Sequence, residues 1–123
     1  MAKRKPTTWL ELAVSTGGFR HGIKAMRWAL MWGVAREALG QEPSVEEVGD
    51  YWHSSRRTAF RDQAAFRKAF PSFETPAPMF ESEAAQAQVG RLAQQFQELA
   101  ESLRSGTPRL DAAVMQLGML GPA

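Results

Sequence analysis

Positively charged and hydrogen-bonding side chains are concentrated between residues 55 and 70. They are Ser55, Arg56, Arg57, Thr58, Arg61, Gln63, Arg67 and Lys68. An arginine guanidinium can donate two hydrogen bonds to O6 and N7 of guanine, and a glutamine amide can pair in the same way with adenine. Hydroxyl groups and helix N-termini suit phosphate oxygens. Because Arg57 and Arg61 are four residues apart, a helix would project them from one side, where both can enter one groove of a duplex. The alternative interpretation is a charged face that only meets solvent.

The distribution of charge along the chain supports a polyanionic partner. The 123 residues carry a net charge of +2. Residues 1–70 hold twelve Lys/Arg and seven Asp/Glu, a net of +5, whereas residues 71–123 have a net of −3. The tail residues Lys3, Arg4 and Lys5 could reach an adjacent minor groove or the phosphate backbone, or could serve only as a solubilising terminus. A basic first half is typical of proteins that bind nucleic acids.

The elements that must position these residues are helical, and we expect an all-α fold. The longest helix is expected over about 20–39, because its apolar residues recur every three or four positions. They are Ile23, Met26, Leu30, Val34 and Ala38. Trp28 and Trp32 form a second apolar face, which is typical of a helix at the centre of a small bundle. Gly40 is a natural stop.

Two shorter helices follow, joined by a tight turn. Ser44 and Glu47 form a capping box, which predicts a helix over about 44–52. His53 to Ser55 is too short for anything but a turn, and Ser54 or Ser55 can cap a further helix that ends at Pro71. Ala59, Phe66 and Phe70 are expected on the inner face of that helix. A short helix over residues 9–14, capped by Thr7 or Thr8 and ended by the Ser15–Gly18 segment, is expected to precede the long one.

Residues 44–70 resemble the helix-turn-helix of small bacterial transcription regulators, with the closest correspondence from Val45 to about Phe66. In that family the first helix has an apolar residue, then a small one, then an apolar one before the turn. Val48, Gly49 and Trp52 match these positions, and Gly49 would allow the second helix to cross closely. The resemblance implies a tri-helical core whose helix 55–70 enters the major groove.

Three positions depart from the family pattern. His53 replaces the usual turn glycine, although histidine can adopt the left-handed conformation at some cost. Ser54 follows where an apolar residue is usual, and Asp62 occupies an apolar position of the second helix. We expect Phe60 and Phe66 to take over the packing at Asp62.

The rest of the chain predicts a C-terminal helical extension. Residues 71–81 are rich in proline and are interpreted as a linker between residues 1–70, the helix-turn-helix domain, and residues 82–123. A helix over about 82–105 carries an apolar stripe with heptad spacing, and a short one is expected over about 108–117. The proposed dimerisation residues of that stripe are Val89, Leu92, Phe96, Leu99 and Leu103. The stripe is expected to pair with its copy in a homodimer, and the alternative is that it folds back on helix 20–39.

Composition excludes several other classes of protein. The chain has no cysteine and only two histidines, His21 and His53, so we expect no disulfide, no metal site and no cofactor. No run of residues approaches the roughly 18 apolar positions of a membrane span, nor the apolar core of a signal peptide, so a cytoplasmic protein is expected. The absence of asparagine and the excess of Arg over Lys are typical of GC-rich bacteria. No residue constellation looks catalytic.

We therefore expect a sequence-specific protein that binds double-stranded DNA and regulates transcription. One alternative is a protein-interaction adaptor that uses the same three helices without binding DNA. The other is an enzyme or a sensor of a small ligand. Salt-dependent retention on DNA separates the first two classes, and an apolar pocket between the tryptophan-rich helix and the rear helices would favour the third.

Overall fold

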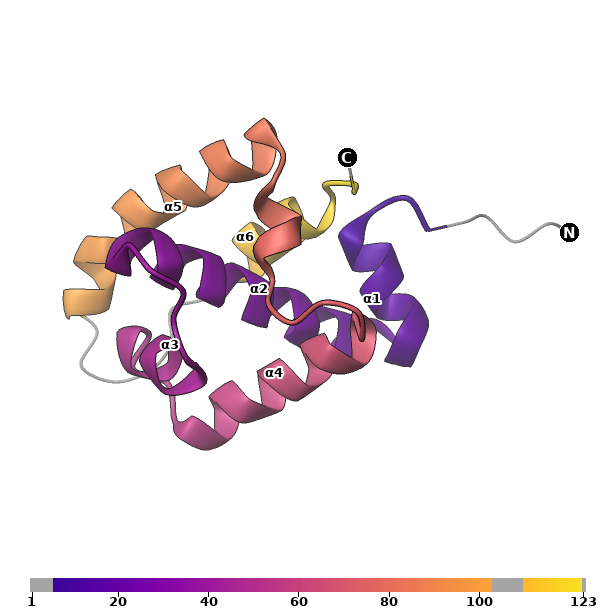
Figure 1. The fold of residues 1–123 in the computed structure, drawn as a ribbon, viewed down its shortest axis with the longest axis horizontal. Helices are drawn as coiled ribbons and strands as arrows, with labels where there is room; N and C mark the ends of the chain where they lie inside the picture. The colour runs from indigo at the N-terminus through magenta and orange to yellow at the C-terminus, as the bar shows by residue number, and fades with distance from the viewer. Residues whose placement is uncertain (1–5, 103–109, 123) are drawn as a thin grey trace, which may run out of the picture.

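The computed structural model describes residues 6–102 and 110–122, except for the side chains of 97–102. Within these ranges the chain forms six α-helices, one 3-10 helix and no strand, so the prediction of an all-α fold is confirmed (Figure 1). The helices are α1 Trp9–Gly17, α2 Phe19–Leu39, α3 Val45–Tyr51, α4 Arg56–Ala69, α5 Glu83–Ser102 and α6 Asp111–Gly118, with the 3-10 helix η1 at Ala77–Phe80.

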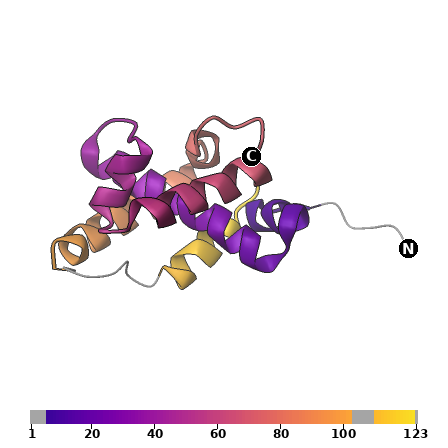
Figure 2. The same ribbon diagram turned by 90° about the horizontal axis from the view of Figure 1, so that it is seen from below.

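Helix α2 lies at the centre of the fold, and the other helices surround it (Figures 1 and 2). Every residue from Trp28 to Ala35 is buried, which covers more than two consecutive turns. Only a helix with neighbours on all sides can bury such an uninterrupted run, because 3.6 residues complete a turn. The expectation of a central helix with several apolar faces is therefore confirmed, and Trp28, Trp32 and Trp52 all belong to the core.

Local signals in the sequence set most of the helix ends. The Thr8 hydroxyl accepts a hydrogen bond from the Glu11 amide and caps α1. Ser44 and Glu47 form the predicted capping box at α3, with both hydrogen bonds at 3.2 Å. Gly40 ends α2 in the left-handed conformation, with φ at 72°.

The prediction for α1 was too short by three residues. The helix continues through Gly17, because the Ser15 and Thr16 hydroxyls donate to carbonyl oxygens of the preceding turn and so remain compatible with a helix. The chain reverses only at Gly18, where φ is 90°. Paired glycines therefore mark the turn correctly, but only the second one breaks the helix.

The proline-rich segment after α4 packs onto the core. Met79 and Phe80 of η1 are buried, and the Phe80 ring stacks on Trp32 with 6.3 Å between centroids. The Arg36 guanidinium lies 4.9 Å from the Trp32 ring and 5.5 Å from the Phe80 ring, where a cation–π attraction is expected. The segment interpreted as a linker thus contributes side chains to the same core as α2.

The apolar stripe of α5 is covered within the chain. Val89, Leu92 and Phe96 are buried, α5 packs on α2, and the Phe96 ring contacts Trp52 at 5.7 Å. This arrangement corrects the expectation that these side chains meet a second copy, since the fold-back alternative already covers them. The side chain of Leu99 and all of Leu103 lie outside the described residues. Dimerisation stays a prediction, and these three side chains are not exposed to mediate it.

Helix α6 closes the fold against α1 and α2. Val114 and Leu117 are buried, and the Trp9 amide donates to the Leu120 carbonyl oxygen at 3.0 Å. Among the helices of the described ranges, none has the combination of length and apolar character that would let it cross a membrane.

Two helix-interior glycines give a matched test of this packing. A Cβ on Gly33 would lie 2.5 Å from Cζ of Phe80, whereas a Cβ on Gly90 would meet no atom within 4 Å. We expect Gly33→Ala to lower the free energy of unfolding by about 1–3 kcal/mol, because the Phe80 ring is buried and stacked on Trp32 and cannot shift cheaply. Gly90→Ala should raise it by about 0.5–1 kcal/mol, because alanine favours a helix. Chemical denaturation of the two variants measures both changes, and equal effects would contradict the packing described for η1.

Candidate nucleic-acid interface

Helices α3 and α4 are joined by a turn with a complete set of backbone hydrogen bonds. The His53 amide donates to the Asp50 carbonyl oxygen at 3.2 Å, and the Ser54 amide donates to that of Gly49 at 2.8 Å. These two bonds define a Schellman motif, whose central residue must be left-handed. His53 fills that position with φ at 53°, as expected from the sequence. The departure from glycine therefore leaves the geometry of the turn intact.

The hairpin is anchored to the central helix by Trp52. Its indole Nε1 donates to the Met31 carbonyl oxygen at 3.0 Å, and the side chain is 1% exposed. Gly49 is buried beneath the start of α4, but a Cβ there would lie 3.5 Å from the Ser54 oxygen and 3.6 Å from Cβ of Ala59. Both are ordinary contacts, so the crossing requires a small residue and alanine would also fit.

Helix α4 has one buried face and one exposed face. Its buried residues, Ala59, Asp62, Ala65, Phe66 and Ala69, pack mainly on α2. The exposed residues include Arg56, Arg57, Arg61, Arg67 and Lys68, all five of the helix's cations. The structure therefore brings the predicted cationic residues together on the outward side of one helix.

Asp62 is the one acidic residue of α4, and it points inward. Its side chain is 2% exposed and forms a two-pronged ion pair with Arg27 of α2, with N–O distances of 2.7 and 2.8 Å. The carboxylate raises the pKa of Arg27 above its ordinary value, chiefly through these hydrogen bonds. Asp62 is thus buried at a position where the sequence resemblance led us to expect an apolar residue. Its charge is neutralised and does not reach the exposed face.

Phe60 was expected to replace the packing lost at Asp62, and that expectation is wrong. Its side chain is 46% exposed, whereas Phe66 is buried as expected. The reason is that Arg27 reaches across from α2 to Asp62, so no apolar substitute is needed at that position. The helix consequently keeps Phe60 on the outward side, among its cations.

The hydroxyl and amide groups of the candidate site differ in availability. The Ser55 hydroxyl caps α4 by accepting from the Thr58 amide, and it also donates to the Thr58 hydroxyl at 3.0 Å. Ser55 is thus committed to the helix end, whereas Thr58 is exposed and still carries its own O–H group. Gln63 is half-buried at the edge of the face. Lys3, Arg4 and Lys5 lie outside the described residues.

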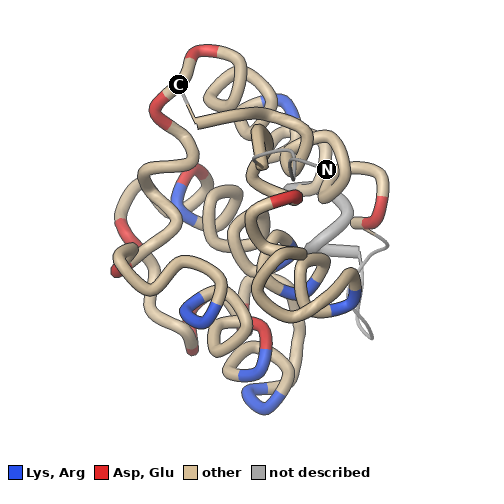
Figure 3. The backbone as a smooth tube through the Cα atoms, turned by 90° about the vertical axis from the view of Figure 1, so that its right-hand side faces the viewer, with Lys and Arg blue, Asp and Glu red and all other residues tan. Residues whose placement is uncertain are grey.

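The start of α2 also carries exposed cations, Arg20 and Lys24. The pKa of His21 is lowered from its ordinary value, first by burial and then by the positive charges of Lys68 and Lys24. Lys68 of α4 and Lys24 of α2 thus both act on His21, and α4 packs on α2. Blue segments predominate in the lower part of Figure 3, where α4 lies, and red segments predominate above. Apart from the buried Asp62, the acidic residues of the hairpin are on α3, at Glu46, Glu47 and Asp50.

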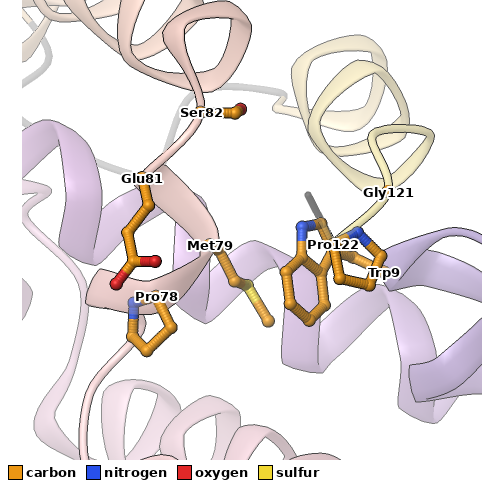
Figure 4. A pocket seen from close by; sticks show the side chains of 7 residues that line it. All are labelled: Trp9, Pro78, Met79, Glu81, Ser82, Gly121 and Pro122. Carbon is orange, nitrogen blue, oxygen red and sulfur yellow. The ribbon is translucent and has the colours of Figure 1, made fainter.

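The surface has hollows away from the hairpin. One, of about 160 Å³, lies between α1, η1 and the C-terminal segment, and in it Met79 points toward the Trp9 ring (Figure 4). This volume is below the roughly 300–1,000 Å³ of typical small-molecule sites. A more open hollow of about 470 Å³ between α2 and α5 has Glu37 and Arg91 as its charged lining. Within the described ranges, no three His, Cys, Asp or Glu side chains are grouped so that they could hold a metal ion.

No protein-family model, curated protein or solved structure matches the chain. The geometry and charge of the hairpin are therefore what indicates a function.

The ion pair between α2 and α4 generates a test of how the candidate face is held. Arg27→Ala should lower the free energy of unfolding by about 3–5 kcal/mol, because it strands a buried carboxylate. Asp62→Ala should cost less, because the side chain of Arg27 is 35% exposed and can regain water. The double variant Arg27→Leu and Asp62→Leu should recover most of the loss, since well-packed apolar residues can replace a buried pair. Urea denaturation of the three variants gives the order, and a milder effect for Arg27→Ala than for Asp62→Ala would contradict it.

Proposed function

We propose that the chain binds double-stranded DNA by inserting α4 into the major groove, and that it acts in the cytoplasm as a transcription regulator. The observation that carries the proposal is the exposed face of α4, which presents five cations and has its one acid buried in an ion pair. A helix is about 10–12 Å across with its side chains, and the major groove is about 12 Å wide. The shape and the charge of α4 both suit that groove.

Each exposed group then has a distinct role. Arg57 and Arg61 point the same way from successive turns, so both can donate two hydrogen bonds to guanine edges. The Thr58 hydroxyl, near the helix N-terminus, suits a phosphate oxygen. Arg67 and Lys68, at the other end of α4 and near Lys24 of α2, suit the phosphate backbone. The rigid Schellman turn and the Trp52 anchor fix the direction of the helix.

The second candidate is a protein-interaction adaptor that uses this face for an acidic partner. The same cations would bind an acidic protein, so the two candidate functions differ in the shape of the partner and not in the sign of its charge. The major groove of a duplex admits a single convex helix, whereas an acidic protein partner would need a groove of its own to receive α4. For that reason we favour the groove of a duplex.

Salt dependence provides the first test. The affinity of the full chain for duplex DNA should fall steeply with salt, because each phosphate contact releases condensed counterions. With three to five phosphate contacts per protomer, the slope of log K against log[salt] should be about −3 to −5, and about twice that for a dimer. Fluorescence anisotropy with a duplex selected from a random pool measures the slope. Absence of binding at about 50 mM salt would overturn the proposal and favour the adaptor.

Arginine substitutions provide the second test. Arg57→Ala and Arg61→Ala should each cost about 1–3 kcal/mol at the selected sequence and relax its base preference. Lys68→Ala should weaken all sequences about equally, because a backbone contact carries no base information. Arg91→Ala, which removes an exposed arginine from α5, is the matched control and should leave binding unchanged. Equal losses in all four variants would show that binding is not directed by α4.

A further inference from the structure

Phe60 is an exposed aromatic residue that takes no part in the hydrophobic core. Its side chain is 46% exposed, whereas the other phenylalanines of this segment, Phe66 and Phe70, are buried. Leaving a phenyl ring in water is unfavourable, and helix α4 would form as well or better with alanine at this position. Exposed among the cations of α4, the Phe60 ring is free to contact an apolar group of a binding partner.

The neighbours of Phe60 narrow the chemistry of that contact. On a helix, residues three or four positions apart have Cβ atoms about 5–6 Å apart. Phe60 therefore stands one turn from Arg56 and Arg57 on one side, and one turn from Gln63 and Ala64 on the other, with Arg61 next to it in the chain. The nearest acid in the sequence, Asp62, is buried. The partner must present an apolar group between hydrogen-bond acceptors or negative charges.

We propose that Phe60 contacts the 5-methyl group of a thymine in the major groove, next to the bases that Arg57 and Arg61 contact. This inference rests on the proposed function of α4. The thymine methyl is the apolar group on a base edge in the major groove, and it lies between two rows of phosphates, as the pattern around Phe60 requires. An acidic protein surface with a small apolar pocket is the competing occupant, and the experiment below separates the two.

Replacing thymine by deoxyuridine tests the contact, because it removes the methyl group and keeps the base pair. The full chain is titrated against duplexes of its selected sequence in which each thymine is replaced in turn. At one or two positions the wild type should bind about threefold to tenfold more weakly. Phe60→Ala should bind the thymine duplex more weakly by a similar factor and should be indifferent to deoxyuridine at those same positions.

Phe19→Ala is the matched control, because Phe19 is also an exposed phenylalanine, at 60%, but belongs to α2. This variant should keep the full response to deoxyuridine. Circular dichroism should show both variants folded, because neither removes a buried side chain. The inference is overturned if no position responds in the wild type, or if Phe60→Ala keeps the response. Failure of the wild type to bind any duplex would overturn the proposed function itself, which distinguishes that result from loss of this contact alone.

Discussion

The burial of α2 on all sides is the constraint on which the rest of the structure depends. Eight consecutive residues, Trp28–Ala35, are covered, so helices must approach from every direction. Helices α1, α4, α5 and α6 supply the larger contacts, and α3 and η1 complete the shell. Glycine at position 33 lets the Phe80 ring lie against the helix backbone, and the Met31 carbonyl oxygen accepts a hydrogen bond from Trp52. One helix thus orders both the C-terminal segment and the candidate interface.

The Arg27–Asp62 ion pair connects this core to the exposed face of α4. A buried pair of charges seldom adds much stability over apolar packing. Its directional hydrogen bonds, however, favour one rotation of a helix about its own axis relative to the helix it packs on. Here the pair directs Asp62 inward and leaves Phe60 and the cations outward. The same contact removes the one negative charge of α4 from the surface. The Arg27–Asp62 ion pair therefore determines both how α4 packs and which charges its exposed face carries.

The hairpin itself is stiff for local reasons. Hydrogen bonds between residues close in sequence hold the start of α3, at the Ser44 capping box, and the start of α4, at the Ser55 cap. The hydrogen bond from Trp52 to the Met31 carbonyl oxygen fixes the hairpin to α2. A surface that reads base edges needs this stiffness, because the geometry of two-pronged hydrogen bonds tolerates little displacement. Flexible side chains on a rigid helix satisfy that requirement.

The sequence by itself determined the helical class and, closely, the bounds of α2, α3 and α4. The signals at Ser44, Glu47, Ser55 and Gly40 act through hydrogen bonds or backbone conformations that involve at most a few neighbouring residues, so they can be recognised without the fold. Cationic residues four positions apart likewise had to share one side of α4. The sequence also indicated that the Ser15–Gly18 segment ends α1, although the helix runs on through Ser15 and Thr16, whose hydroxyls donate to carbonyl oxygens of the preceding turn.

Only the tertiary structure decided what covers each face. Periodicity shows that α5 has an apolar stripe, but whether α2 or a second copy covers it depends on the path of the chain between them. For the same reason Asp62 could not be recognised as buried, because its partner, Arg27, is 35 residues away and belongs to another helix. Once that pair forms, the exposure of Phe60 follows from the rotation of α4. Contacts between distant segments are absent from local patterns, so they had to come from the fold.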